Sequence, residues 1–406
     1  EALAALVAAA APGLVTSPGP RYFGFVTGGA LPAALAADWL TATWDQNSAL
    51  AAMSPAAAAC EEAVADWLLD LLRLPPTAGL GLVTGGQMAN TTCLSVAVET
   101  VLRRAGHDPV RAGLAGCPPV TIVVGAEAHA TIWRALRFLG IGTAQVRTVP
   151  VDDQGRLRAD LLDGVLAEVD GPFVACAQAG NVNSGAFDPL GPIADIVHAH
   201  GGWLHVDGAF GMWAVATERR HLCDGHDLAD SWGVDLHKWL NVPYDSGAAI
   251  VADRAAMNDS LRMAAPYLVA GDALRDNSSF SHEASRRARA FAAWAAIRSL
   301  GRAGMAELVD RCCDLAAEFA ALLSAHSRLA VLNDVVINQV MVRVDDDDAA
   351  TARLIAAVQA DGTMWAGPTV WQGRTAMRIS VSNWATNRQD IAVSAAAIER
   401  LLASDG

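Results

Sequence analysis

The chain has 406 residues, of which 53% are apolar and 18% charged, and its formal net charge is −14. This length favours more than one domain, and this composition excludes a disordered chain. The acidic balance makes nucleic acid and anionic membranes poor partners. The 7 cysteines lack metal-ligand spacing, and no apolar run is long enough to cross a bilayer. We therefore expect a cytoplasmic protein with reduced thiols, no metal and no membrane segment.

The N-terminal part reads as helices around one loop. Residues 1–15 are apolar without a preceding basic region, so they predict an N-terminal helix and not a signal peptide. Residues 18–29 form a Gly/Pro loop with three aromatic residues, and residues 31–72 look helical, with a break near Ser54-Pro55.

Short apolar strands and helices then alternate. A short apolar piece leads into a Gly-rich turn and a helix near residue 86. Further strands are expected at 121–125, 144–151, 172–180 and 203–210, with helices at 129–140, 158–169 and 191–201. This alternation predicts an α/β fold whose central sheet is mainly parallel and carries helices on both faces.

The C-terminal part predicts a smaller α+β domain. A long helical stretch at 284–325 precedes strands at 339–344 and 375–383 and helices at 350–362 and near the C-terminus. The acidic run 345–348 predicts a solvated turn. We expect an N-terminal arm at 1–62, a large domain at 63–300 and a small domain at 301–406.

Polar residues interrupt the apolar pattern where the expected strands end. In open parallel sheets ligands bind at the carboxyl ends of the strands, so these residues are the candidate site. They are Gly85, Gly86, Gln87, His129, Asn181, Asn183, Asp207, His237 and Lys238.

Each of these residues has a functional and a structural interpretation. The glycine turn before a helix suits an anion, although a plain tight turn explains it equally well. Asp207 at a strand end needs a cationic partner such as a pyridinium N–H, or else it is a cap or a salt bridge. Lys238 in a semi-apolar pocket can form a Schiff base with an aldehyde, whereas most lysines are surface residues. His129 can stack on a flat ring or be structural. Together these features describe pyridoxal 5′-phosphate.

Several stretches carry a family resemblance: RYFGFVTGGALP, VTGGQMAN, HATIWRA, GNVNSGAFDP, HVDGAFGMW, SWGVDLHKWLNVPYDSG, SRRARAFAAW and MRISVSNW. In this order they resemble the group II pyridoxal-dependent decarboxylases, which include aromatic amino acid, tyrosine and glutamate decarboxylases. The resemblance covers roughly residues 18–400. It implies fold type I, the aspartate aminotransferase fold, and a homodimer with active sites at the subunit interface, to which segments near Trp39 and Trp44 would contribute unless they pack in the core.

The resemblance also implies roles for single residues. Lys238 matches the Schiff-base lysine, Asp207 the partner of the pyridine nitrogen, and His129 the ring-stacking histidine that is also implicated in catalysis. Further expected cofactor contacts are Gly86, Gln87, Met88, Asn183 in preference to Asn181, Ala209 and His237. Phe25 and Thr27 match a loop that lines the substrate pocket. Arg378 matches an arginine that binds a substrate carboxylate, with a structural ion pair as the alternative.

One segment departs from the family pattern. The animal decarboxylases carry a long loop after the lysine, with a tyrosine that reprotonates the substrate carbon. Here the corresponding stretch is short, and its single tyrosine, Tyr267, aligns before that loop. Phe280 and His282 lie within the stretch, so His282 and His129 are the alternative proton donors.

The expected reaction is decarboxylation of an L-amino acid, with an aromatic or apolar side chain favoured, through a Lys238 Schiff base. It would release CO2 and an amine. Because the loop tyrosine is missing, the second hypothesis is that the carbanion is rerouted toward an aldehyde by oxidative decarboxylation, toward C–C lysis or bond formation, or toward aminotransferase-like chemistry. A non-catalytic binding protein on the same fold is the third hypothesis.

Overall fold

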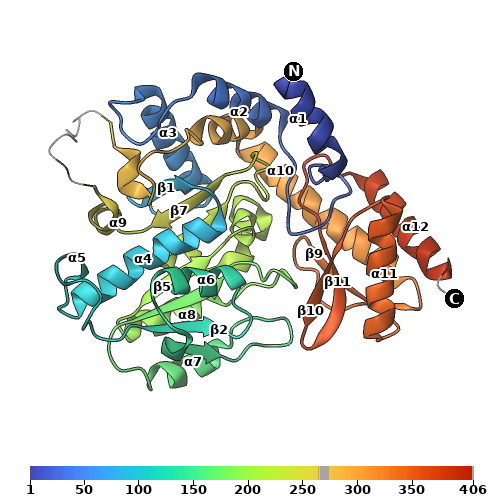
Figure 1. Ribbon diagram of the computed structural model, residues 1–406. Helices are drawn as coiled ribbons and strands as arrows, with labels where there is room; N and C mark the ends of the chain where they lie inside the picture. The colour runs from blue at the N-terminus through green and yellow to red at the C-terminus, as the bar shows by residue number, and fades with distance from the viewer. Residues whose placement is uncertain (264, 266–273, 405–406) are drawn as a thin grey trace.

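A computed structural model describes residues 1–263, 265 and 274–404, and its larger sheet has seven strands in the order β1-β7-β6-β5-β4-β2-β3 (Figure 1). Neighbouring strands from β3 to β6 pair in parallel, whereas β7 runs antiparallel to both β1 and β6. The mainly parallel α/β fold is thus confirmed. The strands are β1 Gly79–Val83, β2 Thr121–Gly125, β3 Val146–Val149, β4 Phe173–Gln178, β5 Trp203–Asp207, β6 Ser231–Asp235 and β7 Gly247–Val251.

The strands are continuous apolar runs because helices cover both faces of the sheet. Successive side chains point to opposite faces, so Ile122 and Val124 join one hydrophobic core while Val123 joins the other. The first core lies under α4 (Gly86–Arg104), α6 (Ala130–Phe138) and α9 (Arg254–Leu261). The second lies under α3 (Pro55–Leu71), α7 (Ala159–Leu166), α8 (Leu190–Ala199) and α10 (Ala290–Ser324).

The predicted break in the N-terminal helical region is confirmed. Helix α2 spans Pro32–Trp44, and α3 begins after Ser54, whose hydroxyl accepts the backbone N–H of Ala57. Helix α1 (Ala2–Ala10) has no buried residue, and α5 (Pro109–Ala112) is a single turn. In the described part of the chain, no helix combines the length and hydropathy that a membrane span requires.

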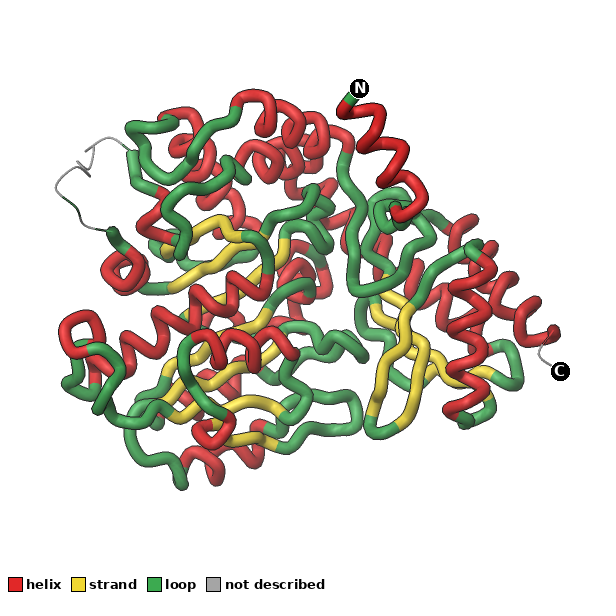
Figure 2. Tube along the Cα trace, in the orientation of Figure 1, coloured by secondary structure: helices red, strands yellow, loops and turns green. Residues whose placement is uncertain are grey.

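A second sheet forms the C-terminal part, as Figure 2 shows, and its four strands are all antiparallel in the order β10-β11-β9-β8. The strands are β8 Leu329–Val331, β9 Gln339–Val344, β10 Gly367–Trp371 and β11 Arg374–Ser380. Helices α11 (Asp348–Asp361) and α12 (Arg388–Ser404) pack with them. In the acidic run, Asp347 is not only solvated: its carboxylate caps α11 by accepting two backbone N–H groups.

Helix α10 connects the two sheets, because it contacts α2 and α3 as well as β8, β9 and α12. It is interrupted at Gly301, whose φ of 61° is left-handed. This break supports the domain boundary after residue 300, which stays a prediction, as does the boundary after residue 62. Short 3-10 helices complete the fold: η1 Ala11–Gly13, η2 Thr143–Gln145, η3 Gly211–Ala216, η4 Glu218–Cys223, η5 His226–Leu228 and η6 Asn277–Phe280.

Candidate active site

Asp207 and Lys238 meet at the carboxyl edge of the large sheet. Asp207 ends β5, and Lys238 follows the end of β6, the parallel neighbour of β5. Asp207 is only 6% exposed, and its carboxylate accepts N–H groups from Asn90 at 2.9 Å and from Ala209 at 3.2 Å. No basic side chain forms an ion pair with Asp207 among the described residues. A buried carboxylate without a cation suits a ligand that brings a cationic N–H.

A chain of hydrogen bonds behind Asp207 holds it in place. His205 Nε2 lies 3.0 Å from Asn90 Oδ1, and His205 Nδ1 lies 3.0 Å from the hydroxyl of Ser231. The indole of Trp203 donates to the same hydroxyl at 2.9 Å. Burial lowers the pKa of His205 to about 4, so the ring is neutral at neutral pH. Sequence reasoning missed Asn90 and His205.

The glycine turn lies beside Lys238 and begins α4. Gly86 donates its backbone N–H to the carboxylate of Asp235, and that carboxylate lies 2.9 Å from Lys238 Nζ and 3.2 Å from His237 Nε2. Burial alone would raise the pKa of Asp235, but the charges of Lys238 and His237 hold it below its ordinary value. A Cβ at Gly85 would come 2.6 Å from His237 Cε1, so this close approach needs glycine.

The N-terminus of α4 is the predicted anion-binding turn, and this role stays a prediction. The side chain of Gln87 donates to Thr91 Oγ1 and to the carbonyl of Thr131, each at 3.3 Å, so it ties α4 to α6. Met88 is partly buried against the hydrophobic core. Ser246 lies next to this turn, and its buried hydroxyl has no hydrogen-bond partner in the described part of the chain. An unpartnered donor there fits a phosphate group.

His129 caps α6, with its Nδ1 2.8 Å from Thr131 Oγ1. Burial lowers the pKa of His129; the charge of Asp207 opposes this shift, and those of Lys238 and Arg378 add to it. These interactions show that His129 lies near the other candidate residues. Because its pKa is lowered, the ring is neutral at neutral pH. That state suits stacking on a flat cofactor.

The two asparagines predicted near the cofactor differ in their bonds. Asn181 Oδ1 accepts the backbone N–H groups of Asn183 at 2.8 Å and Ser184 at 3.2 Å, which is a turn-stabilising arrangement. Asn183 Oδ1 accepts the hydroxyl of Thr369, from β10 of the small sheet, at 2.7 Å. Our preference for Asn183 stays a prediction.

Arg378 lies on β11 of the small sheet. Its guanidinium donates to the carbonyl of Val182 at 3.2 Å, and burial lowers its pKa. Among the described residues no carboxylate forms an ion pair with Arg378, so the contacts give no support to the structural ion pair that we kept as the alternative. This partly buried cation, which interacts electrostatically with His129, is available to a carboxylate ligand.

The N-terminal loop packs directly on Lys238. A Cβ at Gly28 would clash with the carbonyl of Lys238, and the N–H of Gly29 donates to Asn241 Oδ1 at 2.6 Å. Thr27 is buried, whereas Phe25 is 64% exposed with its ring 5.4 Å from that of Trp365. Tyr22 stacks on the same indole at 4.8 Å. Sequence reasoning missed this aromatic cluster, which consists of Tyr22, Phe25 and Trp365.

The structure does not bring His282 and Phe280 into the site. His282 bonds to Thr92 and Ser95, and Thr92 lies about 200° around α4 from Asn90, which contacts Asp207. Phe280 packs in the core under α4. Tyr267 lies outside the described residues. Another tyrosine, Tyr244, has its ring 4.4 Å from that of His237.

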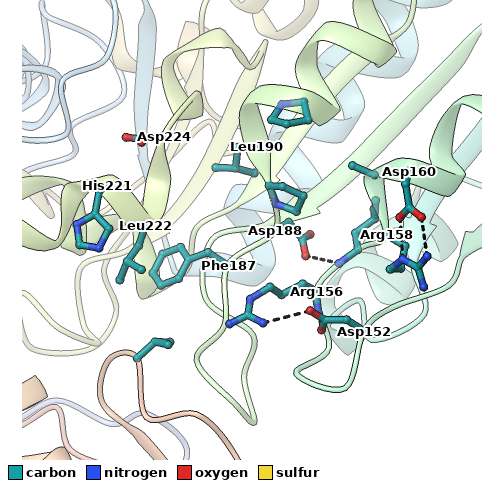
Figure 3. A pocket seen from close by; sticks show the side chains of 15 residues that line it. Asp152, Arg156, Arg158, Asp160, Phe187, Asp188, Leu190, His221, Leu222 and Asp224 are labelled. Atoms are coloured by element: carbon teal, nitrogen blue, oxygen red, sulfur yellow. Dashed lines mark hydrogen bonds and ion pairs between the residues drawn. The ribbon is translucent and has the colours of Figure 1, made fainter.

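A separate groove of about 530 Å³ contains several charged residues but does not form a second candidate site (Figure 3). Its charges are already paired within the protein. Arg156 bonds to Asp152 at 3.1 Å, Arg158 pairs with Asp160, and Asp188 accepts the backbone N–H of Leu157 at 2.7 Å. These contacts organise the loops and leave little for a ligand.

Comparison with known proteins identifies the class. The pyridoxal-dependent decarboxylase conserved domain matches residues 6–345. Tryptophan decarboxylase 1 of Oryza sativa subsp. japonica is 28% identical over 405 residues, covering 92% of this chain and 78% of that protein. The 4-hydroxyphenylacetaldehyde synthase of Rhodiola rosea is 28% identical over 292 residues, covering 69% and 58%. The acidic amino acid decarboxylase of Mus musculus is 32% identical over 304 residues, covering 72% and 54%. The chain therefore spans between 54% and 78% of the length of these three proteins.

Solved structures agree with this assignment. The Oryza sativa TDC structure with PLP and tryptamine has a TM-score of 0.92 at 25% identity, covering 100% of this chain and 88% of that one. The structure of mouse CSAD has a TM-score of 0.89 at 25% identity, covering 96% and 85%. The fold is that of a pyridoxal-phosphate enzyme of fold type I. This chain belongs to the pyridoxal-dependent decarboxylase family, which confirms the predicted family, cofactor and carboxy-lyase class.

Proposed function

We propose that this protein decarboxylates an L-amino acid with an aromatic or apolar side chain and releases CO2 and an amine. The observation that carries the proposal is the meeting of Lys238 and the cation-free carboxylate of Asp207 at two adjoining strand ends. When bound, pyridoxal phosphate supplies a ring that accepts the electrons left on the substrate carbon.

Each candidate residue has its own role toward the cofactor. Lys238 provides the amine that holds the cofactor and later releases it to the substrate. Asp207, held by Asn90, keeps a proton on the ring nitrogen because its negative charge stabilises a cationic N–H. The neutral ring of His129 stacks on the cofactor and excludes water from one face. Backbone N–H groups at the start of α4 and the hydroxyl of Ser246 bind the phosphate.

The substrate end of the site combines one cation and an aromatic wall. Arg378 binds the substrate carboxylate, since a partly buried guanidinium without an ion pair in the described residues favours an anion. Phe25, which lies on the loop over Lys238, and Trp365 offer flat apolar surface to a substrate side chain. This surface supports an aromatic or apolar substrate over an acidic one.

A second candidate reaction is oxidative decarboxylation to an aldehyde. Two observations favour it: the sequence has no tyrosine between Tyr267 and the C-terminus, and a relative at 28% identity is a 4-hydroxyphenylacetaldehyde synthase. Without a residue placed to protonate the substrate carbon, the loaded enzyme would consume oxygen and water and release an aldehyde, CO2, ammonia and hydrogen peroxide.

We also propose that the protein acts as a homodimer. Helices α2, α3 and α10 enclose an apolar surface hollow of about 650 Å³ lined by Leu40, Trp44, Phe291 and Trp294. Trp39 and Trp44 are 66% and 51% exposed, which is unusual for large aromatic residues and supports burial against a second copy. Sedimentation at several concentrations tests this proposal. The cytoplasmic location stays a prediction.

The test of function is the mass of the product. Purified protein with pyridoxal phosphate is incubated with single L-amino acids, with and without oxygen. Loss of CO2 alone, independent of oxygen, supports the decarboxylase. An oxygen-dependent aldehyde with release of ammonia supports the second candidate, and no product from any amino acid contradicts both.

A further inference from the structure

The carboxylate of Asp235 contacts two groups that a bound cofactor would use, the N–H of Gly86 and the amine of Lys238. Its carboxylate accepts the backbone N–H of Gly86, and it lies 2.9 Å from the amine of Lys238. The side chain is buried, and Nε2 of His237 lies 3.2 Å away. These contacts form a closed cluster of Asp235, Lys238, His237 and the first turn of α4.

The first consequence concerns the phosphate. The N–H of Gly86 belongs to the helix N-terminus that suits an anion, and the carboxylate of Asp235 already occupies it. A carboxylate and a phosphate at one helix N-terminus repel each other. Cofactor uptake therefore has to displace the Asp235 carboxylate or bind against its charge.

The second consequence concerns the amine. Only the neutral amine condenses with an aldehyde, and a carboxylate at 2.9 Å stabilises the ammonium form. The other charged groups around Lys238 come from three further elements. They are His129 at the start of α6, which interacts electrostatically with Lys238, the charges of Asp207 at the end of β5 and Arg378 on β11 that act on His129 as well, and the adjacent His237 with Asp245 beyond it. Asp235 is the carboxylate in direct contact.

We propose that Asp235 is a positioning residue that limits how fast the protein takes up pyridoxal phosphate, by its ion pair with the amine of Lys238 and by occupying the N–H of Gly86. For uptake, the ammonium loses a proton to solvent, the neutral amine adds to the aldehyde carbon, and one water leaves as the C=N bond forms. The freed carboxylate keeps His237 as its partner.

The backbone at Asp235 is held independently of its side chain. Its N–H donates to the carbonyl of Ala209 at 2.9 Å, and the indole of Trp213 donates to its carbonyl at 3.0 Å. An asparagine at this position keeps an oxygen that can accept the N–H of Gly86 while it removes the charge. We therefore expect Asp235→Asn to fold.

The test measures cofactor uptake by the stripped full-length protein, without any substrate. Stopped-flow absorbance follows formation of the lysine-bound cofactor at pH 7, and borohydride reduction with mass spectrometry verifies attachment to Lys238. The matched control is Asp230→Asn. Asp230 precedes the same strand at its other end and accepts the N–H of Leu204 at 2.8 Å.

We expect Asp235→Asn to take up the cofactor at least about tenfold faster than the parent and Asp230→Asn, because the amine of Lys238 loses its ion pair and the phosphate no longer meets a carboxylate at the start of α4. Equal rates would mean that Asp235 only caps α4, and slower uptake by a folded variant would mean that Asp235 assists binding; either result overturns the proposal. If Asp235→Asn fails to fold, Asp235→Ser replaces it under the same criteria. Since no substrate is present, the outcome does not depend on which amino acid the enzyme uses.

Discussion

Asn90 donates a side-chain N–H to the carboxylate of Asp207 at 2.9 Å, and its carbonyl oxygen lies 3.0 Å from His205 Nε2. An amide can do both only if His205 carries its proton on Nε2. The Nδ1 atom then accepts from Ser231. The chain of donors therefore runs in one direction toward Asp207, and it orients the carboxylate that is expected to face the cofactor.

We expect Asn90→Leu to weaken both cofactor binding and turnover. The variant leaves a buried carboxylate with one donor fewer, and a hydrogen bond to a charged group contributes about 1.5–3 kcal/mol. This predicts a loss of about 10- to 100-fold in kcat and in cofactor affinity. Thr100→Val on the same helix is the control, because the Thr100 hydroxyl donates within α4 to the carbonyl of Val96. Unchanged kinetics in Asn90→Leu would show that the amide does not support Asp207.

His205 makes stability depend on pH. Its pKa is about 4 in the folded chain, whereas an unfolded histidine titrates near 6.5. Between these values the unfolded state binds more protons, so stability falls as the pH falls. The lost contribution is about 3 kcal/mol at pH 4. Burial raises the pKa of Asp188 to about 6, which has the opposite effect in the same range.

The comparison of the parent with His205→Gln separates the two groups, since Asp188 is present in both proteins. We expect the variant to be less stable at pH 7.5 and the difference in unfolding free energy to shrink by about 3 kcal/mol as the pH falls from 6.5 to 4. Urea unfolding at a series of pH values measures this difference. A constant difference would argue against a neutral, buried His205.

Lys238 is expected to be indispensable. Lys238→Ala should abolish turnover and the absorbance of the lysine-bound cofactor, because no other amine lies at the site in the described residues. Lys238→Arg keeps a cation beside Asp235 but cannot form the C=N bond with the cofactor. This variant should therefore preserve the stability of the fold and lose activity as completely as Lys238→Ala. Turnover or lysine-bound cofactor in either variant would refute the role of Lys238.

The sequence predicted those candidate site residues that lie at the ends of strands. Asp207 and Lys238 both follow apolar runs, and parallel strands bring their carboxyl ends to one edge. Asn90 could not be found this way, because it lies inside α4 and its partner Asp207 is 117 residues away. His205 looked like an interior strand residue, and its partners Ser231 and Asn90 come from the neighbouring strand β6 and from α4, which packs on the sheet.

Two further features could not be predicted from the sequence pattern. The stacking of Tyr22 on Trp365 depends on how the N-terminal segment crosses the small sheet, which no local pattern encodes. The direction of β7 is another example: its apolar run fits a parallel or an antiparallel strand, and pairing with β1 and β6 decides between them.

Arg378 can be tested against a second arginine on the same strand. Arg374 is half exposed and lies 3.7 Å from Asp346, whereas Arg378 is turned toward His129. We expect Arg378→Met to raise KM at least about tenfold with a smaller change in kcat, since it removes a charged contact to the substrate carboxylate. Arg374→Met should leave both constants unchanged. Equal effects of the two substitutions would assign Arg378 a structural role.

The two candidate proton donors make opposite predictions about the product. His129 interacts with Asp207 and Lys238, while His282 is held by hydroxyl groups on α4. If His129 protonates the substrate carbon, His129→Gln slows amine formation and, in oxygen, raises the share of aldehyde. His282→Gln should leave the ratio of amine to aldehyde at the parent value. The ratio is measured by mass spectrometry under air and under nitrogen. A changed ratio in His282→Gln alone would instead assign proton donation to the segment after Lys238. Because Thr92, the partner of His282, lies about 200° around α4 from Asn90, residues 277–282 would then have to rearrange to bring His282 to the site.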